Sequence, residues 1–211
     1  MPIYFQKIIN DFTQLAVWKI EETESFFAQK VSVQQQVNHP HKRLQHLAGR
    51  FLLPFLYADF PSELIQIANT RKPFLPDEAY HFSISHCGNY AAAIVSSTQR
   101  VGVDVELVTH RVNKIRHKFL HINELIDWKI EGLEEQEKYR TLTLLWSAKE
   151  AMFKWWGRGD IDFSECMQVE ASILAPSGIL KANFKKDDFC TALELHYSLN
   201  NELSLVWVFK D

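Results

Sequence analysis

The chain of 211 residues is poor in the features that mark secreted, metal-stapled and membrane-spanning proteins. Its three cysteines, Cys87, Cys166 and Cys190, are odd in number and have no metal-ligand spacing, which argues against a disulfide framework or a zinc site. No stretch approaches the ~18 apolar residues of a membrane helix, and the first residues lack the apolar core of a signal peptide. We therefore expect a cytoplasmic protein with reduced thiols and no membrane contact.

The sequence also lacks a large charge of one sign, low-complexity tracts and Gly/Ser linkers. The formal net charge is −3, which argues against a general nucleic-acid binder. What the chain does have is 46% hydrophobic and 13% aromatic residues, enough to bury a substantial core. Its length fits one large domain or two small ones, and without a linker any two domains must be closely joined.

The order of hydrophobic patterns predicts an α+β fold. Residues 39–56 have helical periodicity, with Pro54 ending or bending the helix, and residues 111–157 are expected to be helical. Three strands are predicted between them, namely "HFSIS", "YAAAIVS" and "VGVDVEL", and four after them, "MQVEASI", "GILKANF", "TALELHYSL" and "LSLVWVF". This succession of strands, helices and strands is typical of α+β folds rather than of repeated βαβ units.

The strand "VGVDVEL", residues 101–107, carries two acids on one face. Side chains alternate along a strand, so its valines face one side while Asp104 and Glu106 share the other. The Cβ atoms of the two acids would lie about 6–7 Å apart, close enough for both carboxylates to reach one cation. The alternative is an edge strand with a solvated outer face, which this stretch by itself favours.

The segment "LTLLWSAKEAMFKWWG", residues 142–157, is predicted to be an amphipathic helix with charges at unusual places. Lys149 falls in the middle of the apolar stripe, Glu150 lies at its border, and Lys154 follows Glu150 at i+4. The alternative is a surface Glu–Lys pair worth only ~0.3–0.5 kcal/mol, with Lys149 extending its ammonium out to water.

Between these two segments, "FSISHCGNY" places Ser85 and His86 at a strand end beside a Gly-Asn turn. A single histidine in such a place is usually structural. Together, however, the three segments supply three carboxylates for a hard cation, and a hydroxyl and several cations for phosphate.

In this order and at this separation, "KPFLPDEAYHFSISHCGNYAAAIVS", "VGVDVE" and "WSAKEAMFKWWG" resemble the 4'-phosphopantetheinyl transferase superfamily, in its single-chain branch. The upstream "KRLQHLAGRFLL" resembles it more loosely, so the likeness covers residues 42–157. The resemblance implies a monomer of two similar α+β halves related by a pseudo-twofold axis, with coenzyme A in the cleft between them. Residues 1–100 would form the half on the nucleotide side, and residues 101–211 the half that carries the metal-binding acids.

The resemblance also implies a set of functional residues. Asp104, Glu106 and Glu150 would hold Mg²⁺, an ion that prefers oxygen ligands from carboxylates, phosphates and water. Contacts with the phosphates and nucleotide of coenzyme A are implied for Lys154, Lys149, His86, Ser85, Lys72 and Arg43. Lys42 and Arg50 are alternatives to Arg43.

The function implied is transfer of the 4'-phosphopantetheine arm of coenzyme A to a serine of an apo acyl or peptidyl carrier protein, releasing adenosine 3',5'-bisphosphate. Lys154 and His86 would stabilise negative charge, and Glu150, or a metal-held water that it orients, would accept the serine proton. The alternatives are another Mg²⁺-dependent phosphate enzyme, such as a phosphohydrolase or nucleotidyl transferase, and a catalytically silent carrier-binding module.

The segment "HRVNKIRHKFL", residues 110–120, is a candidate contact for the carrier. Read as a helix, it has a basic stripe of Arg111, Lys114 and Lys118 that no acid interrupts. In isolation such a stripe is more often a solvated face. Because the family's carriers are typically acidic around the modified serine, the resemblance favours a role in steering the partner.

Overall fold

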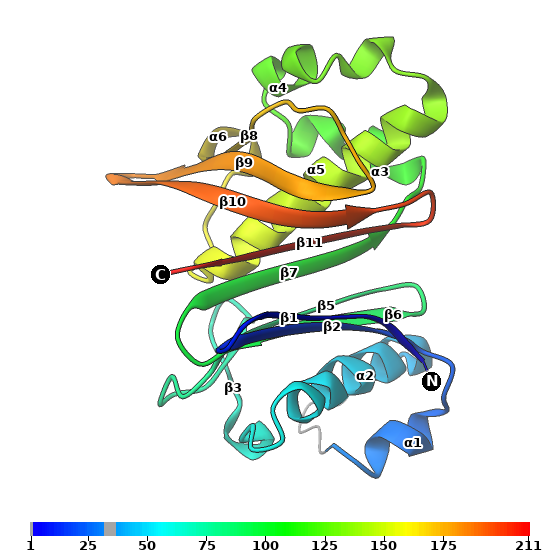
Figure 1. Cartoon of the computed structure of the whole chain (residues 1–211), viewed down its shortest axis with the longest axis vertical. Coiled ribbons are helices and arrows are strands. Elements are labelled where there is room, and N and C mark those ends of the chain that lie inside the picture. Colours follow the sequence, from blue (N-terminus) through cyan, green and yellow to red (C-terminus); the bar gives the residue numbers. More distant parts are fainter. Residues whose placement is uncertain (1, 32–36) are drawn as a thin grey trace.

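The structure is a computed structural model and describes residues 2–31 and 37–211. Two β-sheets pack against each other, and a long helix covers the outer side of each (Figure 1). This mixture of helices and sheets confirms the predicted α+β class. Among the described residues, no helix combines the length and apolar composition needed to cross a membrane.

The first sheet has four strands in the order β1-β2-β6-β5. They span β1 (Ile3–Asn10), β2 (Thr13–Lys19), β5 (His81–Cys87) and β6 (Tyr90–Ser96), and all neighbours are antiparallel. Helix α2 (Pro40–Leu56) covers its outer face beside the short α1 (Glu24–Ala28). Pro at the first position of α2 costs no hydrogen bond, since that N–H would have no partner within the helix.

The second sheet has five strands in the order β7-β11-β10-β9-β8. They span β7 (Arg100–Leu107), β8 (Met167–Val169), β9 (Ser177–Lys186), β10 (Phe189–Leu199) and β11 (Leu203–Lys210). Helix α5 (Glu135–Trp156) packs on its outer face and ends at Gly157, whose φ of 70° suits a residue without a side chain.

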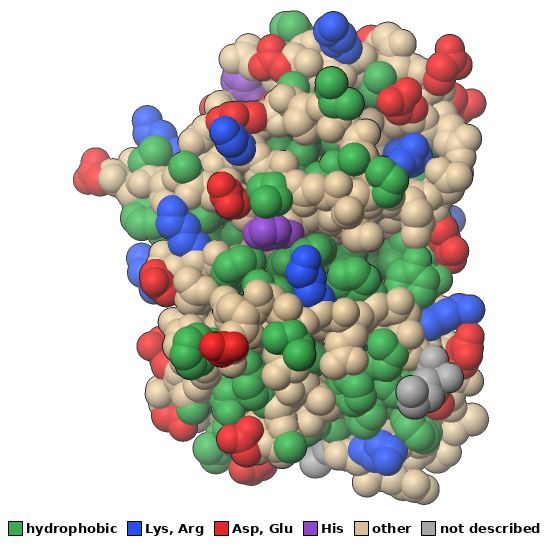
Figure 2. Space-filling model, viewed as in Figure 1, with side chains coloured by type: hydrophobic (Ala, Val, Ile, Leu, Met, Phe, Trp, Pro, Cys, Tyr) green, Lys and Arg blue, Asp and Glu red, His purple; other side chains and the backbone are tan. Residues whose placement is uncertain are grey.

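Short elements connect these parts. They are η1 (Ser62–Leu64), β3 (Gln66–Ile67), β4 (Pro73–Phe74), α3 (Arg111–Ile115), η2 (Arg116–Lys118), α4 (Ile122–Asp127), η3 (Ile130–Gly132) and α6 (Phe163–Cys166). On the face in Figure 2, acidic and basic side chains are interspersed, in agreement with the small net charge.

The hydrophobic core consists of three layers, and the central one joins the two sheets. It contains Leu15, Val17, Tyr90, Ala92 and Ile94 from the first sheet and Val101, Val103, Val105, Leu203, Leu205 and Trp207 from the second. The valines of β7 are therefore core residues, as their alternation predicted. The other face of β7 lies under α5.

Strand β7 is the edge of its sheet, and side chains of β5 cover that edge. Ser83 Oγ, Ser85 Oγ and Cys87 Sγ accept hydrogen bonds from the backbone N–H groups of Val103, Val105 and Leu107, at 3.1, 3.3 and 3.5 Å. These three contacts, hereafter the seam, satisfy donors that a sheet edge would otherwise leave to water. The expectation of a solvated outer face on β7 is wrong, since α5 and β5 bury Asp104 to 2% exposure.

The helices and strands predicted from residue 39 onward are confirmed in type. Strand β8 is shorter than predicted, and the part of the helical region before residue 135 consists of several short helices. The sequence analysis missed β1 and β2. Strand β2 is buried on both faces, so it has no alternation of polar and apolar residues to detect.

We predict that Gly102→Ala destabilises the protein through the contact between β7 and α5. A Cβ at Gly102 would lie 2.0 Å from the carbonyl oxygen of Ala151, and backbone atoms cannot move aside without shifting the helix. Denaturant unfolding should show a loss of about 1–3 kcal/mol. Gly132→Ala is the matched control, because a Cβ there meets nothing within 4 Å. Equal stability of the two variants would contradict this close packing.

Candidate active site

Asp104 lies at the centre of a charged cluster between β7 and α5. Its Oδ1 accepts hydrogen bonds from Ser85 Oγ at 2.8 Å and from Lys154 Nζ at 2.7 Å. The seam places Ser85 here, because the same hydroxyl accepts the N–H of Val105. Asp104 Oδ2 is buried and has no hydrogen-bond partner in the described part of the chain. A buried carboxylate oxygen without a hydrogen-bond partner favours a cation beside it.

Glu106 and Glu150 crowd further negative charge around Asp104. Burial, followed by the charge of Asp104, raises the pKa of Glu106, and Trp146 Nε1 donates to its Oε1 at 3.4 Å. Burial and the charge of Asp104 raise the pKa of Glu150 to about 7, and the ammonium of Lys154 only partly opposes this rise. The sequence prediction that these three acids share one region agrees with this mutual influence.

The donor set suits a divalent cation in charge and chemistry. Three carboxylates and one unpartnered oxygen are the oxygen ligands that Mg²⁺ prefers. Within residues 2–31 and 37–211, however, no three acidic, histidine or cysteine side chains are gathered closely enough to coordinate one ion. In this arrangement the ammonium of Lys154 forms an ion pair with Asp104 Oδ1 and supplies the positive charge beside the acids. Coordination by all three acids would need side-chain rearrangement.

A cavity of about 230 Å³ lies beside this cluster. Two segments distant in sequence line it. Residues before β7 contribute Thr70, Arg71, Lys72, Pro73, Phe82, Ser83 and Ile84, and residues after it contribute Glu150, Phe153, Lys154, Gly157 and Gly159. Lys72 Nζ donates to the carbonyl oxygen of Lys154 at 2.6 Å, and burial lowers the pKa of Lys72 to about 8. Of the three acids, Glu150 is the one that reaches the cavity wall.

His86 follows Ser85 on β5 and is exposed at the surface. Desolvation lowers the pKa of its imidazole, and the charge of Lys154 adds to this effect. Helix α2 carries His46 and Arg50 near His86. Burial has the largest effect in lowering the pKa of His46, and the positive charges of Arg50 and His86 lower it further. His46 Nε2 is buried without a hydrogen-bond partner among the described residues. Sequence reasoning missed His46 and ranked Arg50 second, although their i, i+4 spacing places them on one helix face.

The structure changes the expectation for Arg43. Its guanidinium makes a two-pronged pair with Glu24 at 2.7 and 2.8 Å and donates to the carbonyl oxygen of Val37. Arg50, in contrast, belongs to none of the ion pairs formed within the described residues. The expected anion contact therefore fits Arg50 better than Arg43.

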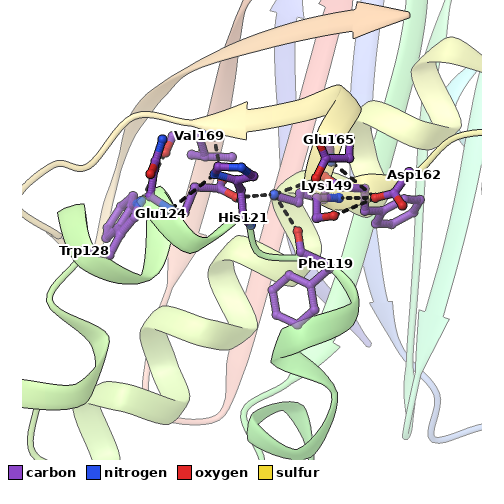
Figure 3. Close-up of polar contacts among 11 residues, drawn as sticks. Phe119, His121, Glu124, Trp128, Lys149, Asp162, Glu165 and Val169 are labelled. Atoms are coloured by element: carbon purple, nitrogen blue, oxygen red, sulfur yellow. Dashed lines mark hydrogen bonds and ion pairs between the residues drawn. The ribbon is translucent and has the colours of Figure 1, made fainter.

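The structure also changes the expectation for Lys149. Its side chain is fully buried, and Nζ donates to Glu124 Oε2 at 2.5 Å and to two carbonyl oxygens, those of Phe119 at 2.6 Å and Phe163 at 3.1 Å (Figure 3). All three ammonium protons are thus in use. Neither phosphate contact nor extension into water agrees with this position, because other protein atoms accept all three ammonium protons of Lys149.

Comparison with known proteins agrees with this geometry. A family model described as the 4'-phosphopantetheinyl transferase superfamily matches residues 100–206, which is half of the chain. The chain belongs to this superfamily. The matched region runs from β7 to β11 and contains the three acids and Lys154, whereas Ser85, His86 and Lys72 precede it.

Individual relatives are similar over the same share of the chain. Enterobactin synthase component D of Salmonella austin is 32% identical over 116 residues, and that of Escherichia coli (strain K12) is 34% identical over 121. The 4'-phosphopantetheinyl transferase gsp of Aneurinibacillus migulanus is 33% identical over 115 residues. Each match covers 54% of this chain and 47%, 54% and 46% of the respective relative. The similarity thus spans about half the length of these relatives.

We predict that Glu150 makes the metal-free protein less stable as pH rises. A folded-state pKa of about 7 exceeds the ordinary glutamate value of 4.5, so between these two pH values the unfolded chain releases a proton that the folded chain retains. Stability from this group is therefore lost as pH rises toward 7. The melting temperatures of Glu150→Gln and wild type should differ less at pH 5 than at pH 8, and at pH 8 the variant should be the more stable of the two. Adding Mg²⁺ at pH 8 should stabilise wild type more than the variant, and the absence of any pH-dependent difference would contradict the crowded-acid site.

Proposed function

We propose that this protein transfers the 4'-phosphopantetheine arm of coenzyme A to a serine hydroxyl of an apo carrier protein. The observation that supports this most is the cluster of Asp104, Glu106 and Glu150 around Lys154, within the segment that matches the family. The relative gsp is named a 4'-phosphopantetheinyl transferase, which favours the same activity here. The serine oxygen would bond to the β-phosphorus, and the broken P–O bond would release adenosine 3',5'-bisphosphate.

The protein's part in this reaction is to position charge. Asp104, Glu106 and Glu150 would hold Mg²⁺, which when bound neutralises diphosphate charge and polarises its oxygens. Lys154 would move its ammonium from Asp104 to a phosphate oxygen, and His86 would donate a hydrogen bond from the facing strand. Glu150 is the proposed acceptor of the serine proton, since it alone of the three acids lines the cavity.

We place coenzyme A across the two halves proposed from the resemblance, residues 1–100 and 101–211. The connection from β6 to β7 is short, and the 230 Å³ cavity is lined by residues from both sides of it. A pseudo-twofold relation would explain why each sheet has one long helix on its outer face. Since a single chain supplies both walls, the proposal requires only a monomer, and we place its carrier substrate in the cytoplasm.

The acidic partner would approach the basic segment that follows β7. Lys114 and Lys118 are exposed there, and the next helix, α4, exposes Ile122 and Ile126 at 61% and 65%. Basic and apolar side chains next to one another suit a partner with an acidic rim and an apolar contact.

Incubation with coenzyme A, Mg²⁺ and apo carriers, followed by mass spectrometry of the carrier, tests the reaction. We expect a mass increase equal to one phosphopantetheine per carrier. Lys154→Ala should remove about 2–4 kcal/mol of transition-state stabilisation, whereas Lys185→Ala, an exposed lysine of β9, should react normally. Free phosphate or a nucleotide adduct without carrier modification would indicate a phosphohydrolase or nucleotidyl transferase. Carrier binding without any product would indicate a silent module.

A paired substitution tests which arginine binds the coenzyme. Arg50 has no ion-pair partner among the described residues, so Arg50→Ala should raise the KM for coenzyme A about tenfold or more, a loss of about 1.4 kcal/mol or more. Arg43→Ala should have little effect on this KM, because its charge already pairs with Glu24. With dephospho-coenzyme A, the Arg50 effect should shrink if that residue contacts the 3'-phosphate. A larger effect of Arg43→Ala would reverse the assignment.

A further inference from the structure

The segment that carries the proposed partner surface consists of elements too short to be stable alone. Residues 111–127, hereafter the docking segment, contain α3 of five residues, η2 of three and α4 of six. Isolated helices of such lengths are unstable in water, so their positions must come from contacts with the rest of the protein. The buried contacts of the docking segment therefore determine where its exposed face lies.

The principal polar contact of the docking segment is the buried pair of Glu124 and Lys149 (Figure 3). Glu124 is 4% exposed, and its Oε2 also accepts the N–H of His121, which caps α4. Lys149, from α5, adds a hydrogen bond to the carbonyl oxygen of Phe119 at the end of η2. One ammonium thus holds the docking segment at both ends of its η2–α4 connection.

The same pair fixes the neighbours of the docking segment. Glu124 Oε1 accepts the N–H of Val169 in β8 at 2.9 Å, and Trp128 Nε1 donates to the carbonyl oxygen of Val169 at 3.1 Å. Lys149 also donates to the carbonyl oxygen of Phe163 in α6. Replacing one member of a buried charged pair leaves the other uncompensated, so the contact is costly to break from one side only.

We propose that Lys149 and Glu124 are positioning residues that hold the docking segment in place for the carrier protein. Lys149 is next to Glu150 in sequence, yet its hydrogen bonds go to the docking segment and to α6. None of these hydrogen-bond partners lines the cavity beside Glu150. The proposal rests on the proposed function for the identity of the partner. It assigns to Lys149 an effect on the protein substrate rather than on coenzyme A.

Lys149→Met and Glu124→Gln are the variants that test this role. Each should raise the KM for the apo carrier about tenfold, comparable to the charge reversal Lys114→Glu/Lys118→Glu, which acts on the exposed face directly. The dissociation constant for coenzyme A, measured by calorimetry, should stay within about twofold of wild type. Hydrogen exchange should accelerate in residues 111–127 and remain unchanged in β7.

The double variant Lys149→Met/Glu124→Met separates positioning from stability. It removes both charges together, so neither side chain leaves an uncompensated buried charge, and it serves if a single variant fails to fold. We expect normal coenzyme A binding with a carrier KM still raised. Weakened coenzyme A binding in Lys149→Met would overturn the proposal and restore Lys149 as a phosphate contact.

Unchanged carrier KM and unchanged exchange in all three variants would also overturn the proposal. If wild type modified no carrier at all, the proposed function would fail. The hydrogen-exchange and coenzyme A measurements would still decide whether the pair holds residues 111–127, so the two failures are distinguishable.

Discussion

The site depends on the way two sheet edges meet. An exposed strand edge presents unpaired N–H groups, and β7 has no strand partner on one side within the described chain. Hydroxyl and thiol side chains at alternate positions of β5 accept these N–H groups, which joins the two sheets without a continuous ladder. Ser85 serves twice, since its hydroxyl accepts from Val105 and donates to Asp104. The join between the sheets and the orientation of the central acid are therefore one arrangement.

A second constraint is the close approach of α5 to β7. Gly102 lets the helix backbone pass where a side chain would collide, and this proximity brings Glu150 and Lys154 to the acids of β7. Burying like charges is unfavourable, as the raised pKa values of Glu106 and Glu150 indicate. Lys154 offsets part of that repulsion. A bound divalent cation would offset more of it, which links the stability of the site to its proposed ligand.

The sequence predicted those parts whose signals are local. Strand β7 and helix α5 have clear periodicity, and both elements form as predicted. The assignment of their acids to one metal site came from the family resemblance and stays a prediction. The roles of Lys149, Arg43 and Arg50 were not predictable, because they depend on partners distant in sequence. Whether Lys149 reaches water or a buried carboxylate is decided by Glu124, and whether Arg43 is available is decided by Glu24.

The missed hairpin of β1 and β2 has a different cause. Its second strand is buried on both faces, and the apolar run of residues 15–18 at its centre could belong to a strand or a buried helix. Pairing with β6 makes this segment a strand, and that pairing joins residues 71 to 83 positions apart in sequence, from Lys19 with Tyr90 to Thr13 with Ser96. Single-sequence periodicity does not contain this information.

The central claim is that Asp104, Glu106 and Glu150 form one cation site between β7 and α5. Calorimetric titration of Mg²⁺ into the protein with coenzyme A present tests it most directly. Wild type and Asp127→Asn, which changes an exposed acid of α4, should bind one Mg²⁺ per chain, and Asp104→Asn should lose this binding. Undiminished Mg²⁺ binding by a correctly folded Asp104→Asn variant would contradict the account.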